Sequence, residues 1–517
     1  MARNNNAGGL AVSNGNMARW ATRIAGAGLL LATLVAGVAQ AQSTVATSGS
    51  SSADQSLTWN GITLYGIVDI GVQYLTHGAP ISDYFPAGTY GAVAKFSNQS
   101  VTAVTPNNLS QSRIGLSGNE PLIGDWAGVF RLETWFNPQS GDISDGLKSV
   151  ALNNGKALTN YTTGVDTSVA GQYFQISYLG FSSPTYGTVT FGRQNTPLAD
   201  GISKYDPMGA SQAFSLIGLS GTAAGGGDTE DRRLDQSLKY TAKFDWVHVG
   251  ALYQFSGSNG SKNTANQFTL GADFAGFSAD LYYAKKYDAV GVTSLSAAQV
   301  EGSKGPPPVP GLAALCNPPT TVPATPPQCY SVSNSLAGTV SDNTTYSVMA
   351  LYKPPSLPLT FYAAWEHITF DNPTNPLPAG TVIEGGYVLA YANNAAYDRS
   401  KVLNFFWGGA KWNVTPSLDV IVGTDDYKQN AFSPEAKLAN CSTQVSSACS
   451  GWYYTASIVA DYRLTKRFDV YVGTLWSEAK NGLANGYLLT SPTELFPGGI
   501  TSTAEALSTT MGVRFKF

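Results

Sequence analysis

The stretch YLGFSSPTYGTVTFGRQNTPLADGISKYDPMG, residues 178–209, decides the fold. A strand ending at Phe181 leads through a tight turn at 182–185 into a second strand, 186–194, whose Thr, Tyr and Val residues suit a pleated, half-buried surface. Residues 195–233 then lose strand periodicity and become polar and Gly-rich. A short turn at one end of a hairpin and a long loop at the other are typical of transmembrane barrels. We therefore expect residues 195–233 to fold back into a barrel and narrow its pore.

Length and composition fit a large membrane barrel. The 517 residues exceed an ordinary soluble domain, although a closed barrel can reach this size. Charged residues make up 12% of the chain, about half of the roughly 25% usual in soluble proteins, which indicates a surface that faces something other than water. Beyond the N-terminal segment, no apolar run approaches the roughly 18 residues that a spanning helix needs.

The N-terminus has the features of a secretory signal peptide. Arg19 and Arg23 precede an apolar run, and an A-x-A cleavage site follows at residues 39–41, so we expect residues 1–41 to be removed on export. A membrane anchor is the alternative, which the short, Gly- and Ala-rich apolar run disfavours. Met17 is an alternative start of the chain.

After cleavage, residues 42–60 would form a flexible N-terminal segment and residues 61–517 the barrel. The mature chain carries 27 basic and 34 acidic residues, a net charge of −7, because residues 1–41 contain three arginines and no acid. This balance disfavours nucleic-acid binding, since neutralising phosphates needs a basic face.

Four cysteines fall in two closely spaced pairs. An exported chain meets an oxidising compartment, so we expect disulfides Cys316–Cys329 and Cys441–Cys449, although other connectivities remain open. Zinc binding is the alternative, but no C-x-x-C motif or neighbouring His supports it.

Apolar and polar side chains alternate along many segments. In residues 61–74, one face carries Ile62, Leu64, Val68, Ile70 and Val72, and the other carries Thr63, Asp69 and Gln73. In a barrel the first face meets lipid and the second meets the lumen. Similar segments lie at 112–138, 178–194, 237–255, 268–283, 343–369, 401–425, 452–476 and 509–517.

These segments predict an all-β fold, a transmembrane antiparallel β-barrel of sixteen strands with short periplasmic turns and long extracellular loops. A polar loop would follow the first strand to about Asn108, and further long loops would occupy 289–342 and 427–450. An even strand number lets the last strand pair with the first, so that no edge remains. A soluble sandwich or propeller explains any one segment, but not the regular alternation of short turns and long loops.

Four blocks of sequence resemble Gram-negative general porins of the beta-proteobacterial type. They are TLYGIVDIGVQY (63–74), SRIGLSGNEPLIGDWAGVFRLETWFNP (112–138), YGTVTFGRQNTPLADGISKYDPMG (186–209), and YRLTKRFDVYVG (462–473) with MGVRFKF (511–517). The resemblance implies a homotrimer of sixteen-stranded barrels in the outer membrane, whose third loop folds inward. It also implies passive diffusion of small hydrophilic solutes and ions, with outer-membrane lipid and lipopolysaccharide as the other partners.

The resemblance further implies roles for individual residues. Arg113 and Arg193 would form the basic side of a constriction. The inserted loop would supply three charged residues to it: Asp200, Lys204 and Asp206. Gln175 stands where many relatives carry an arginine, which weakens an anion preference carried over from the family. The terminal Phe517 fits the aromatic residue that the outer-membrane insertion machinery recognises.

Alternation by itself places Arg113, Arg131 and Glu133 on the lumen side of their strands. Charged side chains at the narrowest point of a pore set its selectivity. Alternatively, these three residues only pair with each other on the lumen wall.

Arg193 and the loop residues each have two interpretations. Arg193 shares its parity with Phe191, which should face lipid, so either Gly192 marks a bulge or the strand has already left the membrane. Asp200 and Asp206 are either pore residues or ordinary turn residues. Aromatic residues near predicted strand ends suit interfacial girdles, or reflect β-propensity alone: Tyr178, Phe244, Trp246, Phe277, Tyr462, Phe468 and Trp476.

An enzyme is the competing class, since some outer-membrane barrels are hydrolases. The chain has three histidines, His77, His248 and His367, and contains no G-x-S-x-G, H-E-x-x-H, P-loop or C-x-x-C motif. We therefore predict no catalytic residue, cofactor or metal site. A substrate-specific channel and a surface adhesin remain as alternatives to a general channel.

Overall fold

The computed structural model describes residues 57–78, 99–139, 141, 174–217, 233–255, 264–294, 336–376, 383–384, 387–388, 391–395, 397–432, 449–484 and 503–517. Nineteen strands of these residues form one sheet, and two very short strands form a second. The described residues include no helix that is long and apolar enough to cross a membrane.

The first half of the large sheet contains β1 (Thr58–Trp59), β2 (Ile62–Gly78), β3 (Gln99–Pro106), β4 (Arg113–Pro121), β5 (Ala127–Trp135), β6 (Ile176–Ser183), β7 (Gly187–Asn195), β8 (Arg233–Phe244), β9 (Val247–Gln254) and β10 (Ala265–Phe274). The second half contains β11 (Phe277–Ser294), β12 (Leu336–Tyr352), β13 (Leu359–Asp371), β16 (Tyr391–Asn394), β17 (Lys401–Thr415), β18 (Leu418–Gln429), β19 (Gly451–Arg463), β20 (Phe468–Asn481) and β21 (Thr503–Lys516). The remaining elements are α4 (Pro197–Tyr205), β14 (Ile383–Glu384), β15 (Tyr387–Val388) and the 3₁₀ turn η5 (Gly482–Ala484).

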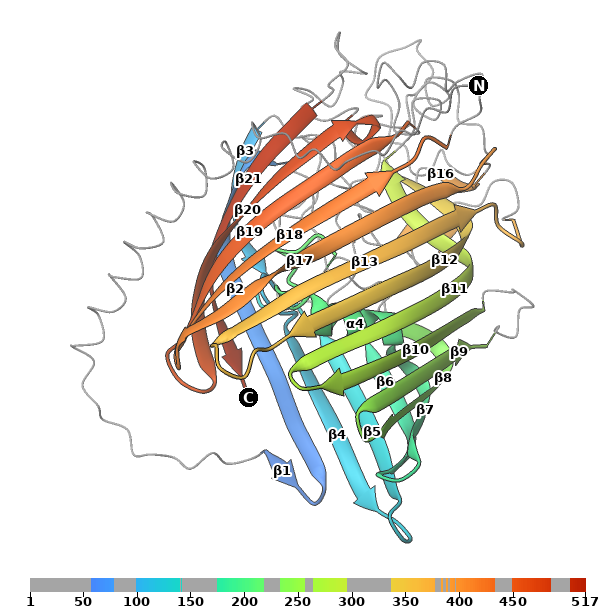
Figure 1. The fold of residues 1–517 in the computed structure, drawn as a ribbon, viewed down its shortest axis with the longest axis vertical. Helices are drawn as coiled ribbons and strands as arrows, with labels where there is room; N and C mark the ends of the chain where they lie inside the picture. The colour runs from blue at the N-terminus through green and yellow to red at the C-terminus, as the bar shows by residue number, and fades with distance from the viewer. Residues whose placement is uncertain are drawn as a thin grey trace, which may run out of the picture. The chain divides into compact units, whose positions relative to one another are not determined.

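The large sheet closes into a barrel (Figure 1). Without the short strands β1, β3 and β16, sixteen of the nineteen strands remain, and each pairs antiparallel with its neighbour around the ring. The ring closes where β2 pairs with β21, from Ile67 opposite Lys516 to Leu75 opposite Ser508. The prediction of a closed sixteen-stranded antiparallel barrel is therefore confirmed.

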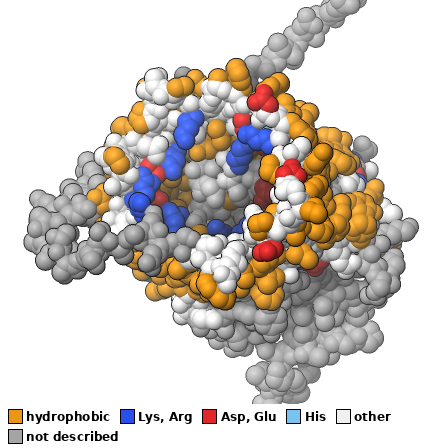
Figure 2. All heavy atoms as spheres, turned by 90° about the horizontal axis from the view of Figure 1, so that it is seen from below, with side chains coloured by type: hydrophobic (Ala, Val, Ile, Leu, Met, Phe, Trp, Pro, Cys, Tyr) orange, Lys and Arg blue, Asp and Glu red, His pale blue; other side chains and the backbone are white. Residues whose placement is uncertain are grey.

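Side chains alternate between an apolar outside and a polar inside. On β2, Leu64 and Val72 are exposed (36% and 44%), whereas Asp69 and Gln73 on the other face are buried. Figure 2 looks into the short-turn end and shows a hollow whose rim carries Lys, Arg, Asp and Glu side chains, with hydrophobic side chains around the outside. The two-residue periodicity thus separates a lipid-facing surface from a lumen.

The loop predicted up to about Asn108 contains a strand, which corrects that expectation. β3 pairs with the upper part of β2 (70–78), and β4 pairs with its lower part (62–67). β3 and β4 are therefore two halves of one strand, interrupted at 107–112. The interruption begins after Pro106, which cannot donate to the ladder with its backbone nitrogen.

Three predicted loops are shorter than expected. Both ends of the loop predicted at 289–342 are strand, because β11 continues to Ser294 and β12 begins at Leu336. The loop predicted at 427–450 begins only after Gln429, and the loop 195–233 is closed at its base by the pair Asn195–Arg233. In β11 and β12, Thr and Val residues beyond the predicted limits extend the ladder. β16 then adds to β12 in parallel.

The C-terminal residue lies at the barrel seam. The backbone N–H of Phe517 donates to the carbonyl of Gly66 (3.1 Å), and the N–H of Gly66 donates back to Phe517 (2.9 Å). The Phe517 ring covers Gly66, where a Cβ atom would collide with it, and stacks on Phe515 at 6.0 Å. Its role in membrane insertion stays a prediction.

Several predictions fall outside the described residues. These are the signal peptide (1–41), residues 42–56 of the mature N-terminus, and Cys316, Cys329 and Cys441. Cys449 is described and is disulfide-bonded. Residues 58–59 of the predicted N-terminal segment form β1, which pairs with the start of β2.

Candidate functional site: the barrel lumen

The segment after β7 begins with a capped helix. The side chain of Thr196 accepts a hydrogen bond from the backbone N–H of Ala199 (3.1 Å). Pro197 occupies the first helical turn, where a backbone N–H has no partner within the helix, so proline loses no hydrogen bond there. The Thr-Pro pair that follows β7 therefore starts α4.

α4 and the residues that follow pack on an apolar patch inside the barrel. Leu198, Ile202, Tyr205, Leu216 and Ile217 are at most 2% exposed. They form one core with inward-facing side chains of β12, β13 and β17, namely Met349, Ile368, Phe370, Leu403, Phe405 and Trp407. Burial of each such side chain is worth about 1.5–3 kcal/mol, so the segment is firmly held.

The segment then continues along the inside of β18–β20, where Met208 and Phe214 pack against side chains of these strands. The hydroxyl of Ser211 and the N–H of Ala213 both donate to the carbonyl of Asn108 (2.7 and 3.1 Å), in the break between β3 and β4. The N–H of Leu216 donates to Asp425 Oδ2 on β18 (3.1 Å). Residues 195–217 are thus tied to the inside of the barrel wall at two further places, the β3–β4 break and β18.

A basic cluster lies on β4 and β5. The carboxylate of Glu133 is buried and accepts hydrogen bonds from Arg131 Nη2 (2.5 Å), Trp135 Nε1 (2.6 Å) and the hydroxyl of Tyr65 (2.9 Å). Arg113 Nε lies 3.9 Å from the same carboxylate. The side chains of Arg113 and Arg131 each remain 32% exposed, so these arginines pair with Glu133 and also present charge to the lumen.

A β-bulge re-aims Arg193. Gly192 has φ +132°, and the register with β8 shifts just after it, which supports the bulge interpretation made from the sequence. Arg193 Nη1 lies 2.5 Å from Asp235 Oδ1, and Nη2 is 3.4 Å from Gln175 Oε1. Gln175 itself is fully buried, so it supports Arg193 and does not line the open pore.

The charged residues of the inserted segment have different positions. Asp200 accepts from Lys239 Nζ at 2.6 Å, which links α4 to β8. Lys204 Nζ lies 3.6 Å from Asp273 and 3.7 Å from Asp280, which links α4 to β10 and β11. Both residues therefore join the helix to the lumen wall through ion pairs.

Asp206 does not line the pore, contrary to the expectation from the resemblance. Its side chain is 4% exposed, and its carboxylate accepts the backbone N–H groups of Met208 (3.1 Å) and Ala210 (2.7 Å). Asp206 thus ends α4 and shapes the following turn, which is the alternative role that the sequence left open.

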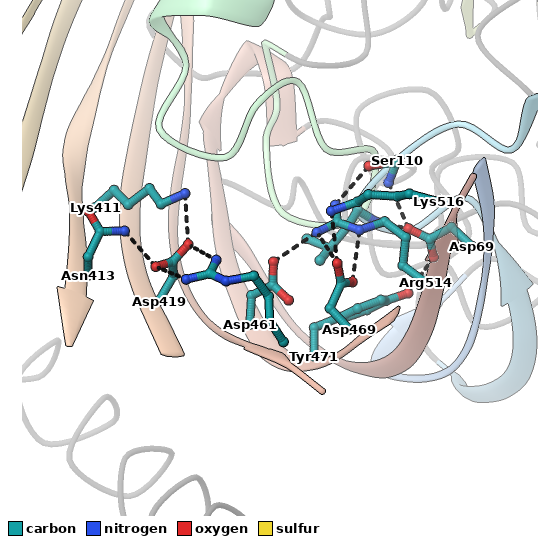
Figure 3. A network of polar contacts seen from close by, with 12 residues as sticks. Asp69, Ser110, Lys411, Asn413, Asp419, Asp461, Asp469, Tyr471, Arg514 and Lys516 are labelled. Carbon is teal, nitrogen blue, oxygen red and sulfur yellow. Dashed lines mark hydrogen bonds and ion pairs between the residues drawn. The ribbon is translucent and has the colours of Figure 1, made fainter. Parts of the chain in front are cut away.

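A second set of ion pairs lines the lower wall on β17–β21 (Figure 3). Asp419 pairs with Lys411 (2.8 Å) and Arg463 (2.6 Å). Arg514 pairs with Asp461 (2.8 Å) and Asp469 (2.9 Å), and Lys516 also pairs with Asp469 (2.8 Å). With the buried Asp69 of β2, which accepts from the hydroxyl of Tyr471 (2.6 Å), acidic and basic side chains are matched in number in this network.

Several lumen residues were not assigned to the site from the sequence, among them Tyr65, Lys239 and Tyr178. Tyr65 and Lys239 have the parity of the inward face, so alternation could have identified both. Tyr178 was placed in the aromatic girdle, which is wrong, because its neighbour Leu179 is 66% exposed on the outside while Tyr178 hydrogen-bonds Arg131 in the lumen.

Comparison with known proteins gives one family throughout. The family model described as Gram-negative porin matches residues 27–482. The chain is 26% identical over 208 residues to an outer membrane porin protein of Bordetella pertussis, and 27% identical over 198 residues to outer membrane porin protein 32 of Delftia acidovorans. These alignments cover 40% and 38% of this chain, and 46% and 44% of the relatives, so the chain matches less than half the length of each.

A solved structure, the anion-selective porin from Comamonas acidovorans, has the same fold. It superposes with a TM-score of 0.53 at 16% identity, over 88% of this chain and 99% of that one. The family model, the named relatives and the closed barrel lead to one conclusion: the chain belongs to the Gram-negative porin family and is an outer-membrane protein.

Proposed function

We propose that this porin is a homotrimeric, water-filled channel for passive diffusion of small hydrophilic solutes and ions, with a weak preference for anions. The lumen is lined by charged and polar side chains, and the segment 195–217 narrows it. The family and the fold indicate a channel rather than an enzyme. Among the described residues, no cluster of three or more His, Cys, Asp or Glu could hold a metal ion.

One observation carries the proposed selectivity. The wall formed by β4–β8 carries five basic residues, and the carboxylates near them are Glu133 and Asp235 on the wall and Asp200 on α4. The basic residues are Arg113, Arg131, Arg193, Lys239 and the buried Arg233, whose guanidinium lies over the ring of Trp135. This surplus of two positive charges lies beside α4, where we propose that the segment 195–217 narrows the lumen. Charge at the narrowest section decides which ion passes more readily. The described lower wall is balanced, so the preference should be weak.

The proposal is tested by single-channel recording in planar bilayers with a salt gradient. The wild type should give a reversal potential that indicates modest anion selectivity, and Arg113→Gln should move that potential toward cations. Lys428→Gln is the matched control, because it removes the same charge from the outer face of β18, where Lys428 lies over Phe406. A shift of equal size in both variants, or none in either, would remove Arg113 from the selectivity region.

Two further results bear on the proposal. Heating-dependent migration in detergent gels should reveal a trimer that dissociates on boiling. Conductance that is blocked saturably by one solute would instead indicate a substrate-specific channel, and bilayers that stay silent would overturn the proposed function.

A further inference from the structure

A histidine lies in the lumen wall beside the inserted helix. His248 is on β9, in the inward-facing register, with 19% of its side chain exposed. Among the histidines whose side chains the structure describes, the other is His367, which alternates on β13 with the buried Glu366 and Ile368 and so faces outward. His248 therefore contacts the aqueous interior, whereas His367 provides a natural comparison on the lipid side.

Two carboxylates hold the imidazole of His248. Its Nε2 lies 2.5 Å from Asp280 Oδ1 on β11, and its Nδ1 lies 3.6 Å from Asp273 Oδ2 on β10. Asp280 also accepts a hydrogen bond from the hydroxyl of Tyr282 (2.7 Å), and Asp273 accepts one from the hydroxyl of Ser278 (2.5 Å). Nε2 is thus within hydrogen-bond distance of one carboxylate and Nδ1 lies near a second, so a proton on each nitrogen would face a carboxylate.

Two lysines complete the cluster. Lys243 Nζ on β8 lies 2.9 Å from Asp273, and Lys204 Nζ on α4 lies 3.6 Å from Asp273 and 3.7 Å from Asp280. The hydroxyl of Tyr205, also on α4, lies 2.8 Å from Ser278. The charged and titratable groups from all four elements around His248 are therefore Lys204, Tyr205, Lys243, Asp273, Asp280 and Tyr282.

Charge in this cluster depends on one proton. With a neutral imidazole, two lysines balance two aspartates; with an imidazolium, the cluster has a net charge of +1. Histidine is the side chain whose charge ordinarily changes between about pH 5 and 8. Asp273 and Lys243 are partly exposed (35% and 59% of their side chains), so an added charge here acts on passing ions.

We propose that His248 is a selectivity-determining residue of the channel, whose protonation raises the preference for anions as the pH falls. This inference rests on the proposed diffusion function. The inference adds a second part of the wall, formed by β8–β11 and α4, whose contribution to selectivity varies with pH (Figure 1). The arginines on β4 and β5 differ from it, because their charge is permanent.

The experiment compares reversal potentials at pH 8 and pH 5 in a low-salt gradient for four proteins: wild type, His248→Gln, His248→Lys and His367→Gln. One charge acting through about 10 Å of water and partial salt screening should change the anion-to-cation permeability ratio about two-fold. The wild type and His367→Gln should show this rise on acidification. His248→Gln should lack it, and His248→Lys should already have the raised ratio at pH 8.

Other lumen carboxylates titrate in all four proteins, so the difference between variants is the decisive quantity. Equal pH dependence in the wild type and His248→Gln would overturn the inference while leaving the channel function intact. Absence of any conductance in the wild type would overturn the proposed function instead. If His248→Gln loses the heat-modifiable trimer, then His248→Lys decides alone: an unraised ratio at pH 8 refutes the inference.

Discussion

At the scale of single residues, Glu133 organises the basic wall. It is a buried carboxylate that accepts three hydrogen bonds, from Arg131, Trp135 and Tyr65, and it lies within 3.9 Å of Arg113. A buried ion pair adds little net stability, but the removal of one partner is costly because the other charge is left uncompensated. Glu133 therefore fixes where the arginines can point.

Glu133→Gln tests this role. We expect the free energy of unfolding to fall by about 2 kcal/mol. This is less than the roughly 3–5 kcal/mol typical of fully buried pairs, because part of the Arg131 side chain reaches water. The anion preference should rise at the same time, since one negative charge is removed. Thermal unfolding on detergent gels and reversal potentials measure the two effects. Glu120→Gln, on the exposed end of β4, is the control and should change neither.

Gly192 sets the direction of Arg193. At φ +132°, a residue with a Cβ is strained, and the added atom would press into the carbonyl of Ser177. Gly192→Ala should lower the free energy of unfolding by about 1–3 kcal/mol and disturb the Arg193–Asp235 pair. Both thermal stability and anion preference should therefore fall. Gly128→Ala in β5, where nothing lies closer than 3.9 Å to the new Cβ, should behave like the wild type; similar losses in both would argue against a special bulge.

At the scale of secondary structure, alternation predicted most strands because lipid and water lie on opposite faces of one wall. It located the inward charges Arg113, Arg131 and Glu133 for the same reason. β3 was not predicted because its sequence, QSVTAVTP, mixes polar and apolar residues on both faces and ends in proline. The position of Arg193 depended on a bulge, which parity can flag but not decide.

The inner apolar patch could not be predicted from alternation. Inward residues such as Ile368, Phe370 and Phe405 are apolar, so their strands look apolar on both faces. The reason is that α4 and its continuation cover them inside the barrel. Only the folded position of residues 195–217 explains why these side chains avoid water, and sequence periodicity does not contain that information.

Leu198→Ala tests whether this packing holds the inserted segment. The cavity should weaken the attachment of α4 by about 3 kcal/mol, since Leu198 is fully buried. We expect noisier open-channel current and faster entry of larger sugars in liposome-swelling assays. Ser203→Ala changes an exposed position on the same helix and is the control. Unchanged sugar permeation in Leu198→Ala would show that the other contacts of the segment hold it in place without Leu198.

At the scale of the whole molecule, stability depends on closing the ring, because an open barrel would expose an unpaired edge to lipid. The seam between β2 and β21 ends at Phe517, whose ring covers Gly66 and whose backbone exchanges two hydrogen bonds with it.

Phe517→Ala keeps the backbone bonds but removes the ring contacts, so we expect a stability loss of about 2 kcal/mol and slower folding into liposomes. The fraction of heat-modifiable protein over time measures both. Met511→Ala, an outward residue of the same strand, is the control, because it also loses lipid contact but lies away from the seam's end. If the two variants fold equally fast and unfold at the same temperature, the terminal ring has no special part in closure, and the backbone ladder alone must seal the barrel.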